Sequence, residues 1–403
     1  MNPKPAMQNH DRHQAEPILE VAIDILAKLV SFASVSSEPN GDVIAFISDY
    51  LSAKGARVER LRSPDQEKEN LWVTFGDDAD SGGLVLSGHI DVVPVTGQTW
   101  TKPPFSLTRD ETRVYGRGTT DMKGFLACAM AASDLFQQGK LRRPVHIAVT
   151  FDEEVGCQGA RELVDFLERR NIRPAAIIVG EPTSMAVVDR HKGSVGFTTE
   201  IVGTPAHSSQ VHLGQSAIRI ASELVNELVV IGEQLMAEAA DAAFPYPYPS
   251  INVGAIRGGE VRNIVAASCT LDWEIRPIVP QQLVDIRQAF DQHVAEKMRQ
   301  YTDAGGLIPS IVTHVAYDTP PLVWWPTSEA VSLAMKFADR NDASAVSYGT
   351  EAGIYQEAGF STVVCGPGDI QQAHAADEWI AIDQLEQCLT FMRRLAQFVA
   401  EPV

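Results

Sequence analysis

Cysteine and positive charge are scarce in this sequence. Its five cysteines are scattered over 403 residues and form no Cys-x-x-Cys pair. An odd number of scattered cysteines in a chain of this size argues against a disulfide framework and favours a reducing compartment. The 33 basic residues are outnumbered by 52 acidic ones, for a net charge of −19. Because an acidic surface repels a phosphate backbone, we expect no nucleic acid partner.

Long apolar runs are absent as well. No run in the sequence reaches the roughly 20 residues of a membrane-spanning helix, so we expect no membrane partner. The first sixteen residues are polar and contain no apolar h-region, so we expect no signal peptide. Together these features predict a cytoplasmic globular protein.

The distribution of apolar residues predicts two domains, which the length of 403 residues also favours. Up to residue 193, short β-rich runs alternate with helical patterns. This alternation is typical of a layered α/β domain with a largely parallel, mixed sheet flanked by helices. We predict strands at 56–61, 70–75, 83–87, 146–151 and 175–179, and helices at 16–32, 43–54, 125–135 and 160–169.

A different pattern follows residue 193. A strand, a helix, two strands, a helix and a strand succeed one another, which is the order of an inserted ferredoxin-like α+β domain. The helix and strand patterns of the first domain then resume. We therefore predict one discontinuous domain at 1–193 and 319–403, and an inserted domain at 194–318. The inserted strands are predicted at 194–202, 251–256, 269–275 and 310–317, with helices at 213–236 and 281–299.

Histidines and acidic residues collect where the predicted strands end. His89 and Asp91 are two residues apart after an apolar run, so their side chains project to the same side. Sites in parallel sheets form at the carboxyl ends of the strands, and imidazole and carboxylate groups are ligands for Zn²⁺ and similar ions. A two-metal site with one shared carboxylate needs five ligands. Five candidates are present: His89, Asp121, Glu154, Glu181 and His374.

Taken alone, each feature has an ordinary explanation. A His near a strand end is usually a polar loop residue, and the acidic run 152–154 could be a solvated turn. The apolar strand directly before that run favours a buried site instead. Glu153 and Glu154 are adjacent, so one can bind metal while the other transfers protons. Asp91 can hold the second ring nitrogen of His89.

Four segments resemble motifs of the M20 family of metallopeptidases and deacylases. They are residues 87–94 (SGHIDVVP), 115–124 (YGRGTTDMKG), 150–156 (TFDEEVG) and 203–208 (GTPAHS). The resemblance extends over roughly residues 17–400 and includes every candidate metal ligand. It implies that residues 1–193 and 319–403 form a catalytic domain. It also implies that residues 194–318 form a lid through which two copies make a homodimer.

The resemblance implies roles for the candidate residues. Two divalent metal ions would be bound, Zn²⁺ in first place with Co²⁺ or Mn²⁺ as alternatives, and Asp121 would bridge them. Glu153 would act as general base toward the attacking water. His207, on the lid, would stabilise the oxyanion in the partner subunit's site. A cis peptide bond is implied between Asp121 and Met122. The terminal metal ligands would be His89, Glu154, Glu181 and His374.

Within the family, the chain most resembles the branch that deacetylates N2-acetyl-L-ornithine in arginine biosynthesis. Segments 180–183 (GEPT), 191–193 (HKG) and 365–374 (CGPGDIQQAH) carry this resemblance. A small N-acyl amino acid would then be the substrate, and its α-carboxylate needs a fixed cation. Arg276, which we expect at a lid strand end beside Asn263, is the candidate because a guanidinium binds a carboxylate in bidentate fashion. A surface ion pair is the alternative for Arg276.

Three functions remain open from the sequence. The first is removal of acetyl from N2-acetyl-L-ornithine. The second keeps the fold and metals but changes the substrate to succinyl-diaminopimelate, another N-acyl amino acid or a dipeptide. The third is a non-catalytic binding protein on the same fold. The presence of both Glu153 and Glu154 argues against the third, because an inactive relative has no need of a general base.

Overall fold

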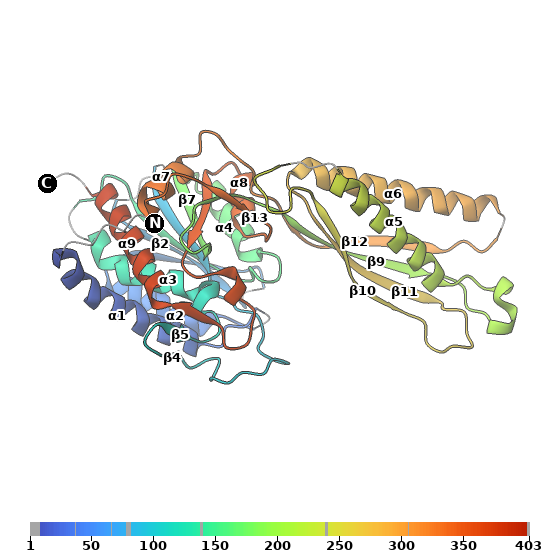
Figure 1. The fold of residues 1–403 in the computed structure, drawn as a ribbon, viewed down its shortest axis with the longest axis horizontal. Helices are drawn as coiled ribbons and strands as arrows, with labels where there is room; N and C mark the ends of the chain where they lie inside the picture. The colour runs from blue at the N-terminus through green and yellow to red at the C-terminus, as the bar shows by residue number, and fades with distance from the viewer. Residues whose placement is uncertain are drawn as a thin grey trace, which may run out of the picture. The chain divides into compact units, whose positions relative to one another are not determined.

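The computed structural model describes residues 9–36, 38–65, 67–77, 82–137, 140–237, 241–304 and 306–400. The chain divides into two compact units (Figure 1). The first unit takes in the described residues up to Asp189, Trp324–Ser344 and the described residues from Thr350 onward. The second takes in the described residues of Arg190–Val323 together with Ala345–Gly349.

An eight-stranded mixed sheet forms the first unit's centre, in the order β1-β2-β6-β3-β7-β14-β8-β13. Its four middle strands β6, β3, β7 and β14 run parallel to one another, and β1, β2 and β8 add antiparallel pairs. The predicted largely parallel, mixed sheet is therefore confirmed. The strands are β1 (Arg57–Arg62), β2 (Glu69–Phe75), β3 (Leu84–His89), β6 (Val145–Thr150), β7 (Ala176–Pro182), β8 (Val188–His191), β13 (Ser344–Val346) and β14 (Thr362–Gly366).

Helices cover both faces of this sheet. Strands β2, β3, β6, β7 and β14 are buried along their whole length, as expected between two helical layers. Leu71 and Val73 of β2 belong to the core shared with α1, α3 and α9, which lie side by side (Figure 1). Trp72 points to the other face, where its ring centroid lies 6.2 Å from that of Phe166 in α4. The helices are α1 (Asn9–Ser31), α2 (Gly41–Ala53), α3 (Gly124–Ala131), α4 (Gln158–Arg169), α7 (Glu329–Ala338), α8 (Ala352–Glu357) and α9 (Ile382–Val399).

Several short elements of the first unit were not predicted. A small sheet in the order β15-β5-β4 pairs Trp379–Ala381 (β15) with Arg113–Tyr115 (β5), and β5 with Thr108–Arg109 (β4). Segments of two or three residues are too short to show a hydrophobic period. The predicted helix at 16–32 was placed too late, because α1 already begins at Asn9.

The described part of the second unit contains a four-stranded antiparallel sheet in the order β10-β11-β9-β12, against which the α-helices α5 and α6 pack. Alternate residues of β11 are buried, and Leu271 and Trp273 pack with Leu224 of α5 and Phe290 of α6. The element order is ferredoxin-like, as predicted. Its elements are β9 (Ser194–Val202), α5 (Ala217–Ala237), β10 (Ser250–Gly258), β11 (Ser268–Arg276), α6 (Pro280–Asp303) and β12 (Ser310–Thr319). Across the described parts of both units, no helix has the length and apolar character needed to cross a membrane.

Candidate active site

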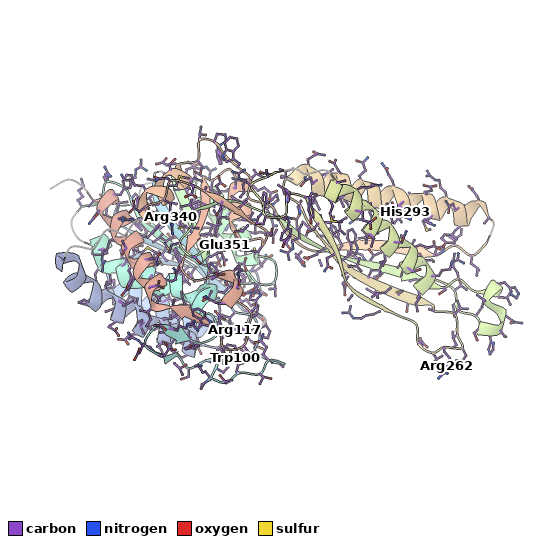
Figure 2. The ribbon with its side chains drawn as sticks, viewed as in Figure 1. Trp100, Arg117, Arg262, His293, Arg340 and Glu351 are labelled. Atoms are coloured by element: carbon purple, nitrogen blue, oxygen red, sulfur yellow. The ribbon has the colours of Figure 1, made fainter. Side chains whose placement is uncertain are left out.

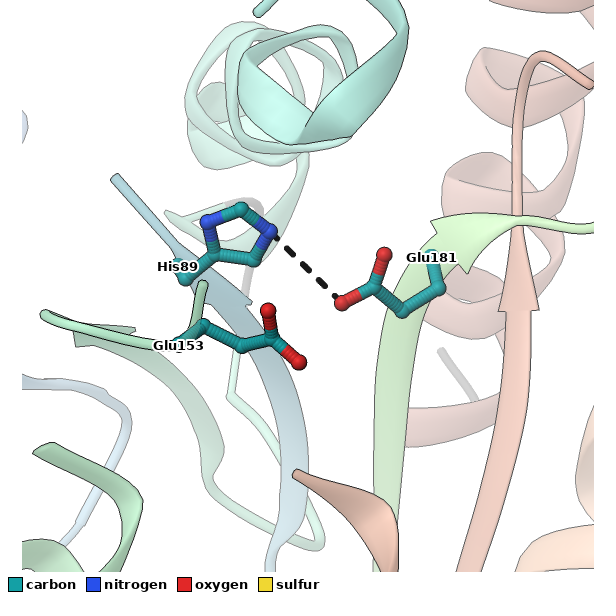
Figure 3. Close-up of side chains that lie close together, drawn as sticks. All are labelled: His89, Glu153 and Glu181. Atoms are coloured by element: carbon teal, nitrogen blue, oxygen red, sulfur yellow. Dashed lines mark ion pairs between the residues drawn. The ribbon is translucent and has the colours of Figure 1, made fainter. Parts of the chain in front are cut away.

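Three neighbouring strands of the first unit end at one edge of the sheet and bring acidic side chains together. His89 is the last residue of β3, Glu153 follows the end of β6, and Glu181 lies at the end of β7. Because β6, β3 and β7 are parallel neighbours, these three side chains converge (Figure 3). The Nε2 atom of His89 is 3.6 Å from Oε1 of Glu181.

Asp121 lies between two histidines. Its Oδ1 is 3.0 Å from Nε2 of His89, and its Oδ2 is 3.2 Å from Nε2 of His374. The same nitrogen of His374 is 3.0 Å from Oε2 of Glu154. The two oxygens of Asp121 thus face different imidazoles, which is the arrangement required of a carboxylate shared by two ions. We call the cluster of His89, Asp121, Glu153, Glu154, Glu181 and His374 the acidic centre.

Metal ions fit the acidic centre. Two groups, His89 with Glu153 and Glu181, and His89 with Asp121 and Glu154, each offer ligand atoms that lie within 4.8 Å of one another. The buried Oε1 of Glu181 accepts no hydrogen bond from the described part of the chain. Four carboxylates facing two imidazoles carry excess negative charge, which divalent cations would offset. The donor set of nitrogen and oxygen suits Zn²⁺, Co²⁺ and Mn²⁺.

Burial dominates the electrostatics of the centre. It raises the pKa of Glu153 and the pKa of Glu181 well above their usual range, and it raises the pKa of Glu154 to about 6. Burial also opposes ionisation of Asp121, but hydrogen bonds from His374 and His89 lower the pKa of this carboxyl. Hydrogen bonds to Asp121 and Glu154 raise the pKa of His374 to about 10. A bound cation would displace protons from the centre, because metal ligands must be deprotonated.

Asp91 anchors the turn that carries Glu153 and Glu154. Its carboxylate accepts hydrogen bonds from the main-chain N–H groups of Glu153 at 3.2 Å and Glu154 at 3.4 Å, and from the Ser36 hydroxyl at 2.8 Å. The Nδ1 atom of His89 is 2.9 Å from the main-chain oxygen of Asp91 and 3.5 Å from its carboxylate. Asp91 therefore contacts both the histidine and the acidic turn.

Two contacts to the acidic turn were not predicted from sequence. Nζ of Lys68 lies 2.5 Å from Oδ1 of Asp152, the residue before Glu153. The Cys157 thiol lies 3.5 Å from Oε1 of Glu153. Lys68 carries no local sequence signal because it is 84 residues from Asp152 in the chain, and a single cysteine four residues after Glu153 is no recognisable motif.

The backbone around Asp121 has two unusual features. The peptide bond between Asp121 and Met122 is cis, which confirms the prediction. Gly118 adopts φ +82°, a conformation that favours glycine, and a Cβ atom there would lie 2.7 Å from Cγ1 of Val92. The turn before Asp121 therefore requires glycine at this position.

His207 and Asn263 lie next to each other in the second unit. The main-chain N–H of Ser208 donates to the carbonyl of Asn263 at 3.0 Å. Nδ1 of His207 accepts from the main-chain N–H of Ser209 at 3.2 Å. A neutral imidazole that accepts at Nδ1 carries its proton on Nε2, so Nε2 of His207 is available as a donor.

The expectation that Arg276 lies beside Asn263 is wrong. Asn263 precedes Ser268, the first residue of β11, whereas Arg276 is the last residue of that strand. Extended backbone of this length spans about 27 Å. Nη2 of Arg276 lies 3.1 Å from Oε2 of Glu274, so Arg276 forms an ion pair within the second unit. Its role toward substrate stays a prediction.

Carboxylates and imidazoles that converge at the carboxyl edge of a parallel sheet are typical of a metal-binding active site. The family model described as "Peptidase family M20/M25/M40" matches residues 85–397. The chain therefore belongs to this family, as the motifs predicted.

Curated relatives cover most of the chain. The "Acetylornithine deacetylase" of Buchnera aphidicola subsp. Acyrthosiphon pisum (strain APS) is 31% identical over 364 residues, covering 89% of this chain and 92% of the relative. The protein of the same name from Pasteurella multocida (strain Pm70) is 34% identical over 359 residues, covering 89% and 91%. With the family membership, these relatives confirm that the protein is a hydrolase that acts on an amide bond.

Solved structures share the fold. A tripeptidase from Staphylococcus aureus subsp. aureus Mu50 matches with a TM-score of 0.73 at 20% identity, covering 94% of this chain and 98% of that one. A dinuclear metal-binding peptidase of the M20 family from Bacillus subtilis matches with a TM-score of 0.66 at 14% identity, covering 96% and 100%. At these identities the likeness concerns the fold alone.

Proposed function

We propose that this M20 hydrolase removes the acetyl group from N2-acetyl-L-ornithine, giving L-ornithine and acetate in arginine biosynthesis. The observation that carries the choice of substrate is the name shared by relatives that are 31% and 34% identical over 89% of the chain. The acidic centre supports the reaction class, because it offers metal ligands and a separate carboxylate for proton transfer.

Two divalent metal ions, Zn²⁺ before Co²⁺ or Mn²⁺, would be held by the acidic centre, and Asp121 would be the ligand that they share. When bound, the ions would activate a water molecule and polarise the substrate carbonyl. Glu153 takes a proton from the attacking water and delivers it to the leaving amine. Asp91 keeps Glu153 in place through the main-chain hydrogen bond at 3.2 Å. The residues that would each hold one ion are His89, Glu154, Glu181 and His374.

The second unit is proposed as the lid and as the surface through which a homodimer forms. In this arrangement His207 donates from Nε2 to the oxyanion in the partner subunit's site, and Asn263, its neighbour in the second unit, binds the same substrate. Arg276 lies at the opposite end of β11 from Asn263, so it would bind the α-carboxylate, as a bidentate donor, in its own subunit's site. None of the five cysteines forms a disulfide, which supports the proposed cytoplasmic location, where thiols stay reduced.

A substrate panel tests the choice of substrate. The protein is reconstituted with Zn²⁺ or Co²⁺ and assayed with N2-acetyl-L-ornithine, N-succinyl-diaminopimelate, N-acetylmethionine and a dipeptide. We expect the highest kcat/KM for N2-acetyl-L-ornithine, by at least about tenfold, because one well-placed polar contact contributes about 1.4 kcal/mol or more. A higher kcat/KM for any other member of the panel would replace the proposed substrate.

Subunit mixing tests the shared site. The variants His207→Ala and Glu153→Ala are each expected to be inactive as homodimers. After subunit exchange, mixed dimers should regain activity, because one of their sites combines an intact His207 with an intact Glu153. Exchange without regained activity, or a fully active monomer, would contradict a contribution from the partner subunit.

A further inference from the structure

Glu378 is a buried carboxylate that lies outside the acidic centre. It is 1% exposed. Its Oε1 accepts hydrogen bonds from the main-chain N–H groups of Thr120 at 2.9 Å and Asp121 at 3.2 Å. Its Oε2 accepts from the N–H of Gly118 at 3.0 Å. One side chain thus binds three main-chain donors of the loop that presents Asp121, and charge-assisted bonds of this kind are stronger than neutral ones.

Arg117, which Figure 2 labels in the first unit, extends this network toward the main chain of His374. Its Nη1 donates to Oε2 of Glu378 at 2.9 Å, and to the main-chain oxygen of Ala375 at 3.3 Å. Its Nη2 donates to the side-chain oxygen of Gln98, whose Nε2 donates to the main-chain oxygen of His374 at 2.6 Å. The loop that carries His374 is therefore tied to the same buried carboxylate.

The small sheet explains why Glu378 reaches this loop. β15 begins directly after Glu378 and pairs with β5, with Trp379 opposite Tyr115. The main-chain N–H of Gly116 donates to the carbonyl of Glu378 at 2.9 Å. The strand pairing sets Glu378 against the turn that follows β5, and its carboxylate then reaches the main-chain N–H groups of that turn.

We propose that Glu378 is a positioning residue that holds Asp121 and, through Arg117 and Gln98, the main chain of His374 in place for metal binding. The inference rests on the proposed metal-dependent function. Asp121 and His374 come from loops far apart in sequence, yet Oδ2 of one lies 3.2 Å from Nε2 of the other. Outer hydrogen-bond partners of metal ligands commonly set their orientation and affinity.

The substitution Glu378→Gln tests this role. Glutamine keeps the size of the side chain, but its NH₂ group replaces a carboxylate oxygen that accepts hydrogen bonds and would face N–H donors. Arg117 also loses its negatively charged partner. We expect the Kd of the apo protein for Zn²⁺ or Co²⁺, measured by calorimetry or chelator competition, to rise about 10- to 100-fold. The absorption spectrum of bound Co²⁺ should also change. On N2-acetyl-L-ornithine, kcat at saturating metal should fall with little change in KM.

Asp377→Asn is the matched control. Asp377 precedes Glu378 and accepts hydrogen bonds from the main-chain N–H groups of Thr101 and Lys102 and from the Thr101 hydroxyl. The substitution removes the charge and alters the hydroxyl contact, and neither change involves Asp121. Its metal affinity should stay within about threefold of wild type. A folded Glu378→Gln protein with wild-type metal affinity and Co²⁺ spectrum would overturn the proposal, and so would an equal loss in Asp377→Asn.

A second variant covers the case in which Glu378→Gln does not fold. Gln98→Ala removes the half-exposed link between Arg117 and His374 and should raise the metal Kd by about three- to tenfold; unchanged affinity would overturn the link. These measurements use metal alone as the probe. Wild-type protein that binds metal but does not cleave N2-acetyl-L-ornithine would refute the proposed substrate and leave the positioning role standing.

Discussion

Glu153 and Glu154 are adjacent carboxylates that should fail in different ways when each is changed to glutamine. The Glu154 carboxylate lies 3.0 Å from Nε2 of His374. The Glu153 carboxylate instead accepts a hydrogen bond from the Cys157 thiol at 3.5 Å, and the Glu153 main-chain N–H donates to Asp91. Glu153→Gln therefore removes the base without releasing the turn. We expect kcat on N2-acetyl-L-ornithine to fall about 10²- to 10⁴-fold, which is about 2.7–5.5 kcal/mol in activation free energy.

Metal content separates the two roles. Elemental analysis after dialysis against excess Zn²⁺ should give wild-type metal in Glu153→Gln and reduced metal in Glu154→Gln. Glu162→Gln, a half-buried change on α4, should alter neither activity nor metal content. Glu153→Gln with more than about a tenth of wild-type activity would refute its role as base. Loss of metal from this variant would make Glu153 a ligand, and full metal in Glu154→Gln would refute the ligand role of Glu154.

Three further predictions concern stability. Burial lowers the pKa of His191 to about 4, so between pH 6.5 and 4 the unfolded chain binds a proton that the folded chain does not, and the free energy of unfolding should fall by up to about 3 kcal/mol. In urea titrations at several pH values, His191→Gln should lose this dependence of the unfolding free energy on pH. An unchanged pH dependence would refute the role of His191. Leu224→Ala, at a fully buried site of α5, should lower the free energy of unfolding by about 2–5 kcal/mol in denaturant titrations. Ile218→Ala on the same helix, at a 42% exposed site, should lower it by less than about 1 kcal/mol. Equal losses would contradict the packing described. Lys68→Met should cost about 1–3 kcal/mol in thermal or urea unfolding, because it leaves the half-buried Asp152 without its cation, and an unchanged midpoint would show that the pair contributes nothing.

Local pattern was enough to predict most of the architecture. The strand predicted at 194–202 coincides with β9 (Ser194–Val202), because inward and outward residues alternate along a half-buried strand. The buried central strands were equally visible as apolar runs that end in acidic residues. In a parallel sheet the carboxyl ends of neighbouring strands lie at the same edge. The fold class therefore predicted that His89, Glu153 and Glu181 would lie close together.

Tertiary structure alone decided two features. The pairing of β15 with β5 involves three residues on each strand, too few for a periodic signal, yet it places Glu378 against the loop of Asp121. Arg276 and Asn263 are close in sequence, but the extended strand between them, β11, spans about 27 Å. Sequence determines which segments can form strands and helices through local periodicity. Which distant side chains meet depends on how those segments pair and on how far an extended chain carries its ends apart.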